Sequence, residues 1–153
     1  MKYTTKYLII NYLKHGHFSE WTQIWEYHKK DLLAQSENWQ ELIENLKLPL
    51  FVIGDFNQTR YNNKGYGTNE VRDILSEILQ KLDLTCVTEF DFSIEHLTAD
   101  PKNGKIRNNI DHICISSSLL TKMKSFQVGA WNHFTEEGKY MSDHNGVCFE
   151  FVL

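Results

Sequence analysis

The sequence predicts an α+β domain in which a mixed β-sheet carries helices on one face. Three observations lead to this fold class: an early strand, helix, strand order, two segments with apolar residues at helical spacing, and a C-terminal part rich in strand-like runs. The chain has 153 residues, of which 41% are hydrophobic and 24% charged, enough for one domain with a single core. We therefore treat residues 1–153 as one domain, without internal repeats or a linker.

The first half of the chain alternates between strand and helix. Residues 6–13, KYLIINYL, are apolar on both faces, as in a buried strand. Between Trp21 and Leu46 apolar residues recur near the 3.6-residue period, with Ser19 as a candidate N-cap and Pro49 after the end. Residues 50–55, LFVIGD, then supply a second strand.

The second half begins with a loop over residues 56–67, which contains two glycines and three asparagines. A helix is predicted to start after Thr68 or Asn69, because apolar residues follow at i, i+3, i+4 and i+7. A strand at 84–90 and a polar loop at 91–108 come next. Three more strands are expected at 108–116, 125–131 and 146–152.

Charge and cysteine content exclude several classes of protein. A formal net charge of −4 argues against a broad basic surface for DNA, although an acidic chain can still bind phosphate locally through a metal ion. The three cysteines show no CxxC spacing, so neither a disulfide framework nor a zinc site is expected. The apolar stretch near the start is too short to span a membrane and lacks a signal cleavage site, so we expect an intracellular protein, cytoplasmic or nuclear.

Three short polar motifs stand where apolar strands meet loops: GDFN at 54–57, NIDHI at 109–113 and SDH at 142–144. Each motif alone has an ordinary structural explanation, since Asp and Asn are common turn formers and SDH can cap the following strand. All three in this order are much less expected by chance. His112 alternates with Asp111 along its strand and is therefore expected in the core.

In order and spacing these motifs resemble the endonuclease/exonuclease/phosphatase superfamily, which implies metal-dependent hydrolysis of phosphoesters. The resemblance implies that Asp55 positions or deprotonates the attacking water and that Asn57 hydrogen-bonds the phosphate. It also implies that Asp111 orients the imidazole of His144, which contacts the scissile phosphate, and that Asp143 lies at the metal or its water shell. The matching part would be the latter half of a four-layer α/β/β/α sandwich.

The chemistry of an in-line attack on a phosphodiester fits these residues. Such a reaction needs a base for water, a cation at the phosphoryl oxygens, and donors that strengthen as negative charge develops. Asp55, a divalent ion near Asp143, and Asn57 with His144 match those needs. Oxygen-rich ligation without thiolates favours Mg²⁺ or Mn²⁺ over Zn²⁺.

The sequence departs from the family pattern at its start. Family members are longer, and their first half supplies an Asn and the Glu that is the principal metal ligand; neither has a counterpart upstream of residues 6–13. The family also has a histidine at the end of that strand, where this sequence has Leu13 or a neighbour of it. His15 and His17 are catalytic candidates only if the register is shifted, and otherwise they are loop histidines without a role. The chain alone is therefore expected to be weakly active or inactive. The alternative function is a catalytically incomplete fragment that binds or assembles with another polypeptide.

The sequence indicates the chemical class of the substrate and the kind of partner, and it names no individual molecule. Arg60, Tyr61 and Lys64 in the loop, and Arg107 before the second motif, are the candidate substrate-binding residues, since cations and rings grip phosphates and bases. A solvated loop explains the same composition. Nucleic acid is the first substrate class, and a phospholipid or inositol phosphate the second. Because the strands are apolar on both faces and helices cover one face, the other face is expected to need a partner, either a second copy or the missing first half of the domain.

Overall fold

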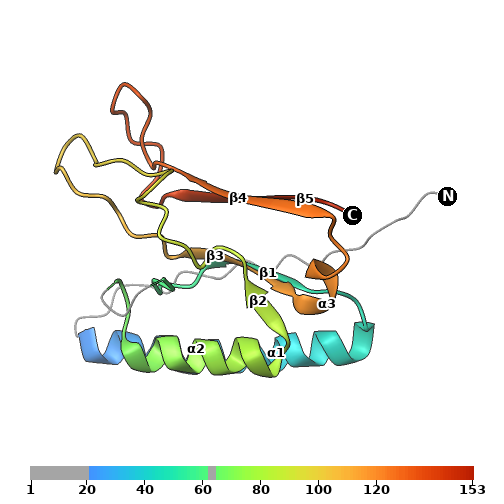
Figure 1. Ribbon diagram of the computed structural model, residues 1–153. Coiled ribbons are helices and arrows are strands. Elements are labelled where there is room, and N and C mark those ends of the chain that lie inside the picture. Colours follow the sequence, from blue (N-terminus) through green and yellow to red (C-terminus); the bar gives the residue numbers. More distant parts are fainter. Residues whose placement is uncertain (1–20, 62–64) are drawn as a thin grey trace.

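The computed structural model describes residues 21–61 and 65–153, and these residues form three layers, a helical layer and two β-sheets (Figure 1). The predicted strand at 6–13, the candidate cap Ser19, and the candidates His15, His17 and Lys64 lie outside the described residues. The elements are α1 (Trp21–Leu46), β1 (Phe51–Asp55), α2 (Asn69–Lys81), β2 (Leu84–Cys86), β3 (Asp111–Ser116), α3 (Ser117–Leu120), β4 (Ser125–Trp131) and β5 (Gly146–Val152).

The helical layer consists of α1 and α2, which lie side by side on one face of the first sheet (Figure 1). The α2 helix starts as predicted, because the Thr68 hydroxyl accepts a hydrogen bond from the Val71 N–H at 3.2 Å and caps the helix. Apolar residues of both helices form one core with the sheet: Leu32, Trp39, Val71, Leu75, Ile78, Leu79, Val52 and Cys114. This confirms the predicted α+β fold with helices on one face. In the described residues, no helix has the length and apolar character that crossing a membrane requires.

The first sheet has the strand order β1-β3-β2, and both pairs are antiparallel. The β2 strand is shorter than the predicted 84–90, and Thr88 explains the difference. One further ladder bond follows β2, from the Val87 N–H to the Ile113 carbonyl at 2.9 Å. The Thr88 hydroxyl then accepts the Ile113 N–H at 3.0 Å, so a side chain replaces the backbone ladder and the chain turns away.

A second sheet of β4 and β5 covers the other face of the first sheet, which corrects the expectation that the chain holds one sheet with an uncovered face (Figure 1). Between the sheets, Phe51 stacks on Phe151 with ring centroids 6.2 Å apart. Buried Phe51, Val87, Ile113 and Ile115 pack against partly buried Val128, Val147, Phe149 and Phe151. The sequence showed that these strands are apolar but not that the last two would pair and fold back over the others.

We predict that Ile115→Ala will lower the free energy of unfolding by about 2–5 kcal/mol, because Ile115 has no exposed surface and fills the space between the two sheets. Urea unfolding followed by fluorescence measures this loss. Ile94→Ala is the matched control, since Ile94 is 79% exposed and its truncation should change stability by about 0.5 kcal/mol or less. Equal losses in the two variants would contradict the packing of β4 and β5 on the first sheet.

Candidate active site

The three polar motifs converge at one edge of the sandwich. Because β1 and β3 are antiparallel, the last residue of β1 lies opposite the first residue of β3, and these residues are Asp55 and Asp111. His144 arrives from the second sheet, on the loop that leads from β4 into β5. Residues far apart in the sequence are thus brought together by strand pairing and by the packing of one sheet on the other.

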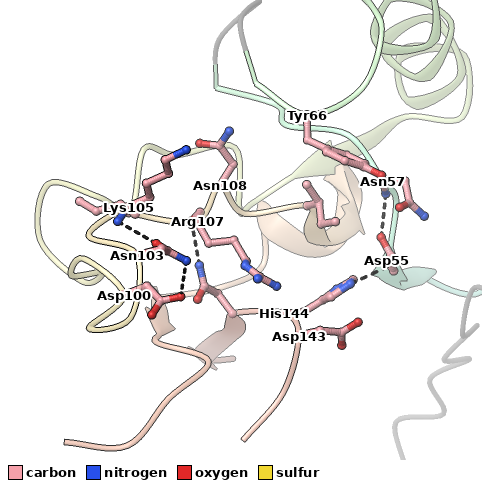
Figure 2. Close-up of a pocket in the computed structure, with 13 residues that line it drawn as sticks. Asp55, Asn57, Tyr66, Asp100, Asn103, Lys105, Arg107, Asn108, Asp143 and His144 are labelled. Carbon is pink, nitrogen blue, oxygen red and sulfur yellow. Dashed lines mark hydrogen bonds and ion pairs between the residues drawn. The ribbon is translucent and has the colours of Figure 1, made fainter. Parts of the chain in front are cut away.

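Asp55 takes part in a local turn and also faces the site (Figure 2). Its Oδ1 accepts a hydrogen bond from the Asn57 N–H at 2.8 Å, and Asn57 has a positive φ of 51°. The turn is fixed to the neighbouring strand by a bond from the Phe56 N–H to the Ile110 carbonyl at 3.0 Å. The GDFN motif therefore forms an Asx turn, and this turn leaves Oδ2 of Asp55 directed at His144.

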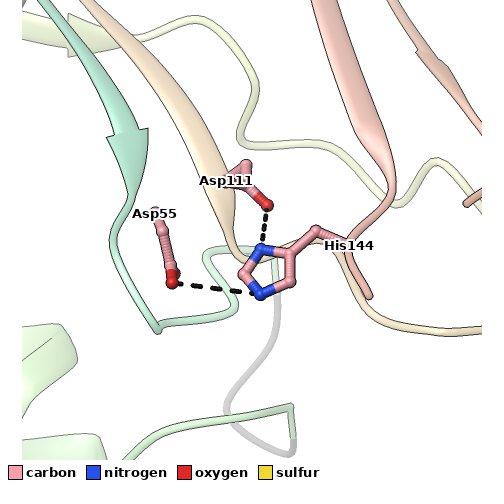
Figure 3. Close-up of side chains that lie close together, drawn as sticks. All are labelled: Asp55, Asp111 and His144. Carbon is pink, nitrogen blue, oxygen red and sulfur yellow. Dashed lines mark hydrogen bonds and ion pairs between the residues drawn. The ribbon is translucent and has the colours of Figure 1, made fainter. Parts of the chain in front are cut away.

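His144 lies between the two carboxylates (Figure 3). Its Nδ1 is 2.8 Å from Oδ2 of Asp111, and its Nε2 is 4.0 Å from Oδ2 of Asp55. An ionised carboxylate only accepts hydrogen bonds, so Nδ1 carries a hydrogen, and in the neutral ring Nε2 presents its lone pair. Asp111 thus sets both the tautomer and the orientation of the imidazole.

Burial raises the pKa of Asp111 above its ordinary value. The hydrogen bond and the charge of His144 act in the opposite direction, and the nearby negative charge of Asp55 adds to the rise. Burial therefore destabilises the ionised form of Asp111, and the interaction with His144 offsets this destabilisation only in part. Asp111 does not line the cavity described below, but its partner His144 does, and perturbed groups in such surroundings occur often at catalytic sites.

A cavity of about 570 Å³ opens at these side chains (Figure 2). Its lining includes the predicted residues Asp55, Asn57, Arg107, Asp143 and His144. The remaining lining residues were not among the candidates named above: Tyr66, Asp100, Asn103, Lys105, Ile106, Asn108, Ile110 and Asn145. Most of these come from the 91–110 loop, in which Arg107 was the candidate for substrate binding.

Arg60 is placed away from this cavity. Its guanidinium side chain is 8% exposed and donates to the Arg72 carbonyl at 3.2 Å and to the Ser76 hydroxyl at 2.9 Å, and it forms an ion pair with Glu89 at 3.3 Å. These contacts tie the loop after β1 to α2. They favour a structural role for Arg60 over the predicted contact with substrate.

Tyr61 and His112 also have defined places. The Tyr61 hydroxyl donates to Oδ1 of Asn108 at 2.7 Å, which joins the loop after β1 to the 91–110 loop. His112 is 1% exposed, as expected for the core. Its Nε2 donates to the Gln58 carbonyl at 2.7 Å, and its Nδ1 lies 3.0 Å from the Thr88 hydroxyl. His112 therefore holds the backbone that directly follows the turn of Asp55.

The donor groups present fit a hard divalent cation. One ligand atom each from Asp55, Asp111 and His144 lies within 4.8 Å of the others, and the carboxylate of Asp143 belongs to the same cavity. Carboxylate oxygens are the ligands that Mg²⁺ and Mn²⁺ prefer. Asp143 was the one metal-binding residue predicted from the sequence.

Residues 21–148 match the family model described as endonuclease-reverse transcriptase. The chain belongs to this family. It is thereby a member of the endonuclease/exonuclease/phosphatase superfamily, which confirms the resemblance seen in the three motifs. No curated protein matches the chain.

Several solved structures share the fold of this chain. The endonuclease domain of TRAS1, a telomere-specific non-LTR retrotransposon, is 23% identical with a TM-score of 0.53, over 80% of this chain and 52% of that one. The human Nocturnin catalytic domain is 20% identical with a TM-score of 0.51, over 94% and 46%. Truncated Caenorhabditis elegans TDP2 is 12% identical with a TM-score of 0.54, over 97% and 55%. The chain thus spans about half the length of the structures it matches.

We predict that Asp111→Asn will raise the melting temperature at pH 7, because it replaces a carboxylate that burial disfavours in its charged form. The pKa of Asp111 is higher in the folded than in the unfolded chain, so the folded state binds a proton at this carboxylate more readily. The folding stability of the wild type therefore gains from this group as the pH falls. The difference in melting temperature between the variant and the wild type should therefore shrink towards pH 4. A difference that grows on acidification would contradict the raised pKa.

Proposed function

We propose that this chain carries the phosphate-binding and imidazole-bearing part of a metal-dependent phosphoesterase that hydrolyses phosphodiester bonds. The observation that supports this most directly is the Asp111–His144–Asp55 arrangement, in which one imidazole lies between two carboxylates at the edge of a cavity. Membership of the superfamily supports the same reaction class.

Each residue of the arrangement has a task in such a reaction. Asp111 holds the Nδ1–H of His144, so that Nε2 faces the cavity and, when protonated, donates to a phosphoryl oxygen. Asp55 accepts from an attacking water through Oδ2, since its Oδ1 is engaged by the Asn57 N–H. The carboxamide of Asn57 stands in the cavity wall as a further donor to phosphate.

Asp55, Asp143 and their neighbours would hold the ion, and Mg²⁺ or Mn²⁺ bound there would supply charge neutralisation at the phosphoryl oxygens. The resemblance assigns the principal metal ligand to a glutamate in the first half of the family's domain. We therefore expect the described residues alone to bind the ion weakly.

Nucleic acid is our first choice of substrate, and a phospholipid or an inositol phosphate the second. The first choice is supported by the family's description and by the likeness to a retrotransposon endonuclease domain. The lining of the cavity offers Lys105 and Arg107 for phosphate and Tyr66 for stacking. With a net charge of −4, recognition would be local and would not use a broad basic surface. An intracellular place of action stays a prediction.

In the active form of this protein, Asp55→Ala, Asp111→Ala and His144→Ala should each lower kcat by about two to four decades with Mn²⁺ present, because each removes positioning or charge stabilisation from the transition state. Plasmid nicking and the hydrolysis of a small phosphodiester substrate, each with and without EDTA, measure the effect. Arg60→Ala is a control that should affect stability more than kcat. The Asp111 and His144 losses should not add in the double variant, and full additivity would show that the two do not act as a unit.

The alternative function, a partial domain that assembles with another polypeptide, is favoured by one group of observations. The chain spans about half of the structures it matches, and the second sheet exposes Phe126, Trp131 and Val152, each at least 50% exposed. In the described residues β4 and β5 pair only with each other, so each has one open edge. A second copy of the chain or the first half of a superfamily domain would cover these groups.

We predict that the chain forms a dimer or larger assembly at micromolar concentration, because this surface buries apolar area when covered. Size-exclusion chromatography with light scattering measures the mass. Phe126→Glu should shift the mass towards the monomer, and Ile94→Glu, at a more exposed position outside the second sheet, should leave it unchanged. A stable wild-type monomer would contradict the prediction.

A further inference from the structure

His133 closes the loop that carries Asp143 and His144. Its carbonyl accepts hydrogen bonds from the Met141 N–H at 2.8 Å and from the Ser142 N–H at 3.3 Å, just before these two site residues. Its own N–H donates to Oδ1 of Asn145 at 3.1 Å, just after them. One residue thus holds both ends of the short segment on which the site residues stand.

The His133 ring makes a second contact with the same amide. Nδ1 lies 2.9 Å from Oδ1 of Asn145, while Nδ2 of Asn145 donates to the Arg107 carbonyl at 2.9 Å. Since that assignment makes Oδ1 an acceptor, Nδ1 of His133 must carry a hydrogen. The ring is 2% exposed, and water therefore has little access to replace the contact.

Behind the ring lies Asp100, which is also 2% exposed. Its Oδ2 is 3.4 Å from Nε2 of His133 and accepts from the Tyr140 hydroxyl at 2.5 Å. Its carboxylate also accepts from the Lys102 N–H and from Nδ2 of Asn103, both at 2.8 Å. These bonds lower the pKa of Asp100, the Tyr140 hydroxyl contributing most. The Asp100 carboxylate thus joins the 91–110 loop to the loop between β4 and β5.

We propose that His133 is a positioning residue of the active site, which uses its Nδ1–H on Asn145, with Asp100 behind it, to set Arg107 and His144 in the lining of the cavity. Arg107, His144, Asn145 and Asp100 all line that cavity, whereas His133 does not. His133 therefore acts through Asn145 and touches no substrate. The kinetic consequence rests on the proposed function, but the placement itself does not.

The experiment compares His133→Asn with His133→Gln in the full chain. The amide nitrogen of Asn takes the place of Nδ1 and can still donate to Asn145, whereas that of Gln takes the place of Nε2 and cannot. In ¹⁵N-labelled protein, we expect His133 of the wild type to carry hydrogen on Nδ1. We expect His133→Asn to leave the His144 ring signals and the Arg107 and Asn145 amide signals near wild type, and His133→Gln to shift them.

Ile78→Val is the control for a general loss of stability, because Ile78 is a buried residue of α2 that does not line the cavity; it should leave these signals in place. Where hydrolysis is measurable, His133→Gln should lower kcat by about 10- to 100-fold with KM little changed, and His133→Asn should restore most of it. If no hydrolysis occurs, the proposed function is in question, and the NMR signals still decide the positioning.

The proposal is overturned if Nδ1 of His133 is unprotonated in the wild type, or if the Asn and Gln variants disturb the His144 signals equally. It is also overturned if neither variant disturbs them. Should both variants fail to fold, the ring nitrogen signals of the wild type alone decide between support and rejection.

Discussion

The hydrogen bond from Nδ1 of His144 to Oδ2 of Asp111 joins the two sheets of the molecule at their polar edge. Asp111 begins β3 in the first sheet, and His144 stands just before β5 in the second. A bond of 2.8 Å between them requires that the sheets keep their separation and angle. The apolar layer between the sheets, from Phe51 and Ile115 to Phe149 and Phe151, therefore sets where the imidazole lies.

Electrostatics and packing oppose each other at this bond. The sandwich partly buries Asp111, and burial raises its pKa, whereas its task of orienting His144 requires the ionised form. The carboxylate of Asp55, paired directly opposite, adds to the same strain. A divalent cation among these groups would relieve this repulsion, which is one reason to expect metal affinity and carboxylate protonation to compete at this site.

Much of the site was predictable because its residues stand at strand ends in short motifs. Asp55, Asn57, Asp111 and His144 followed from such signals, and the pairing of Asp55 with Asp111 follows once β1 and β3 are antiparallel. The second sheet was not predicted, since the apolar pattern of a strand does not determine which other strand it pairs with. Asp100 and His133 were missed for a related reason: they are far apart in the sequence, and only the packing of two loops makes them neighbours.

The buried polar groups outside the motifs share one task, which is to hold loops. Arg60 ties the loop after β1 to α2, His112 supports the turn of Asp55, and Asp100 with His133 joins the 91–110 loop to the loop between β4 and β5. Burying such groups is costly unless they are bonded, so their hydrogen bonds fix how these loops lie around the cavity. It follows that two kinds of defect are separable in this chain. We expect the loss of a loop-holding group to displace the imidazole and the other lining residues, and the loss of Asp55 or Asp143 to weaken the proposed cation site while the cavity keeps its shape.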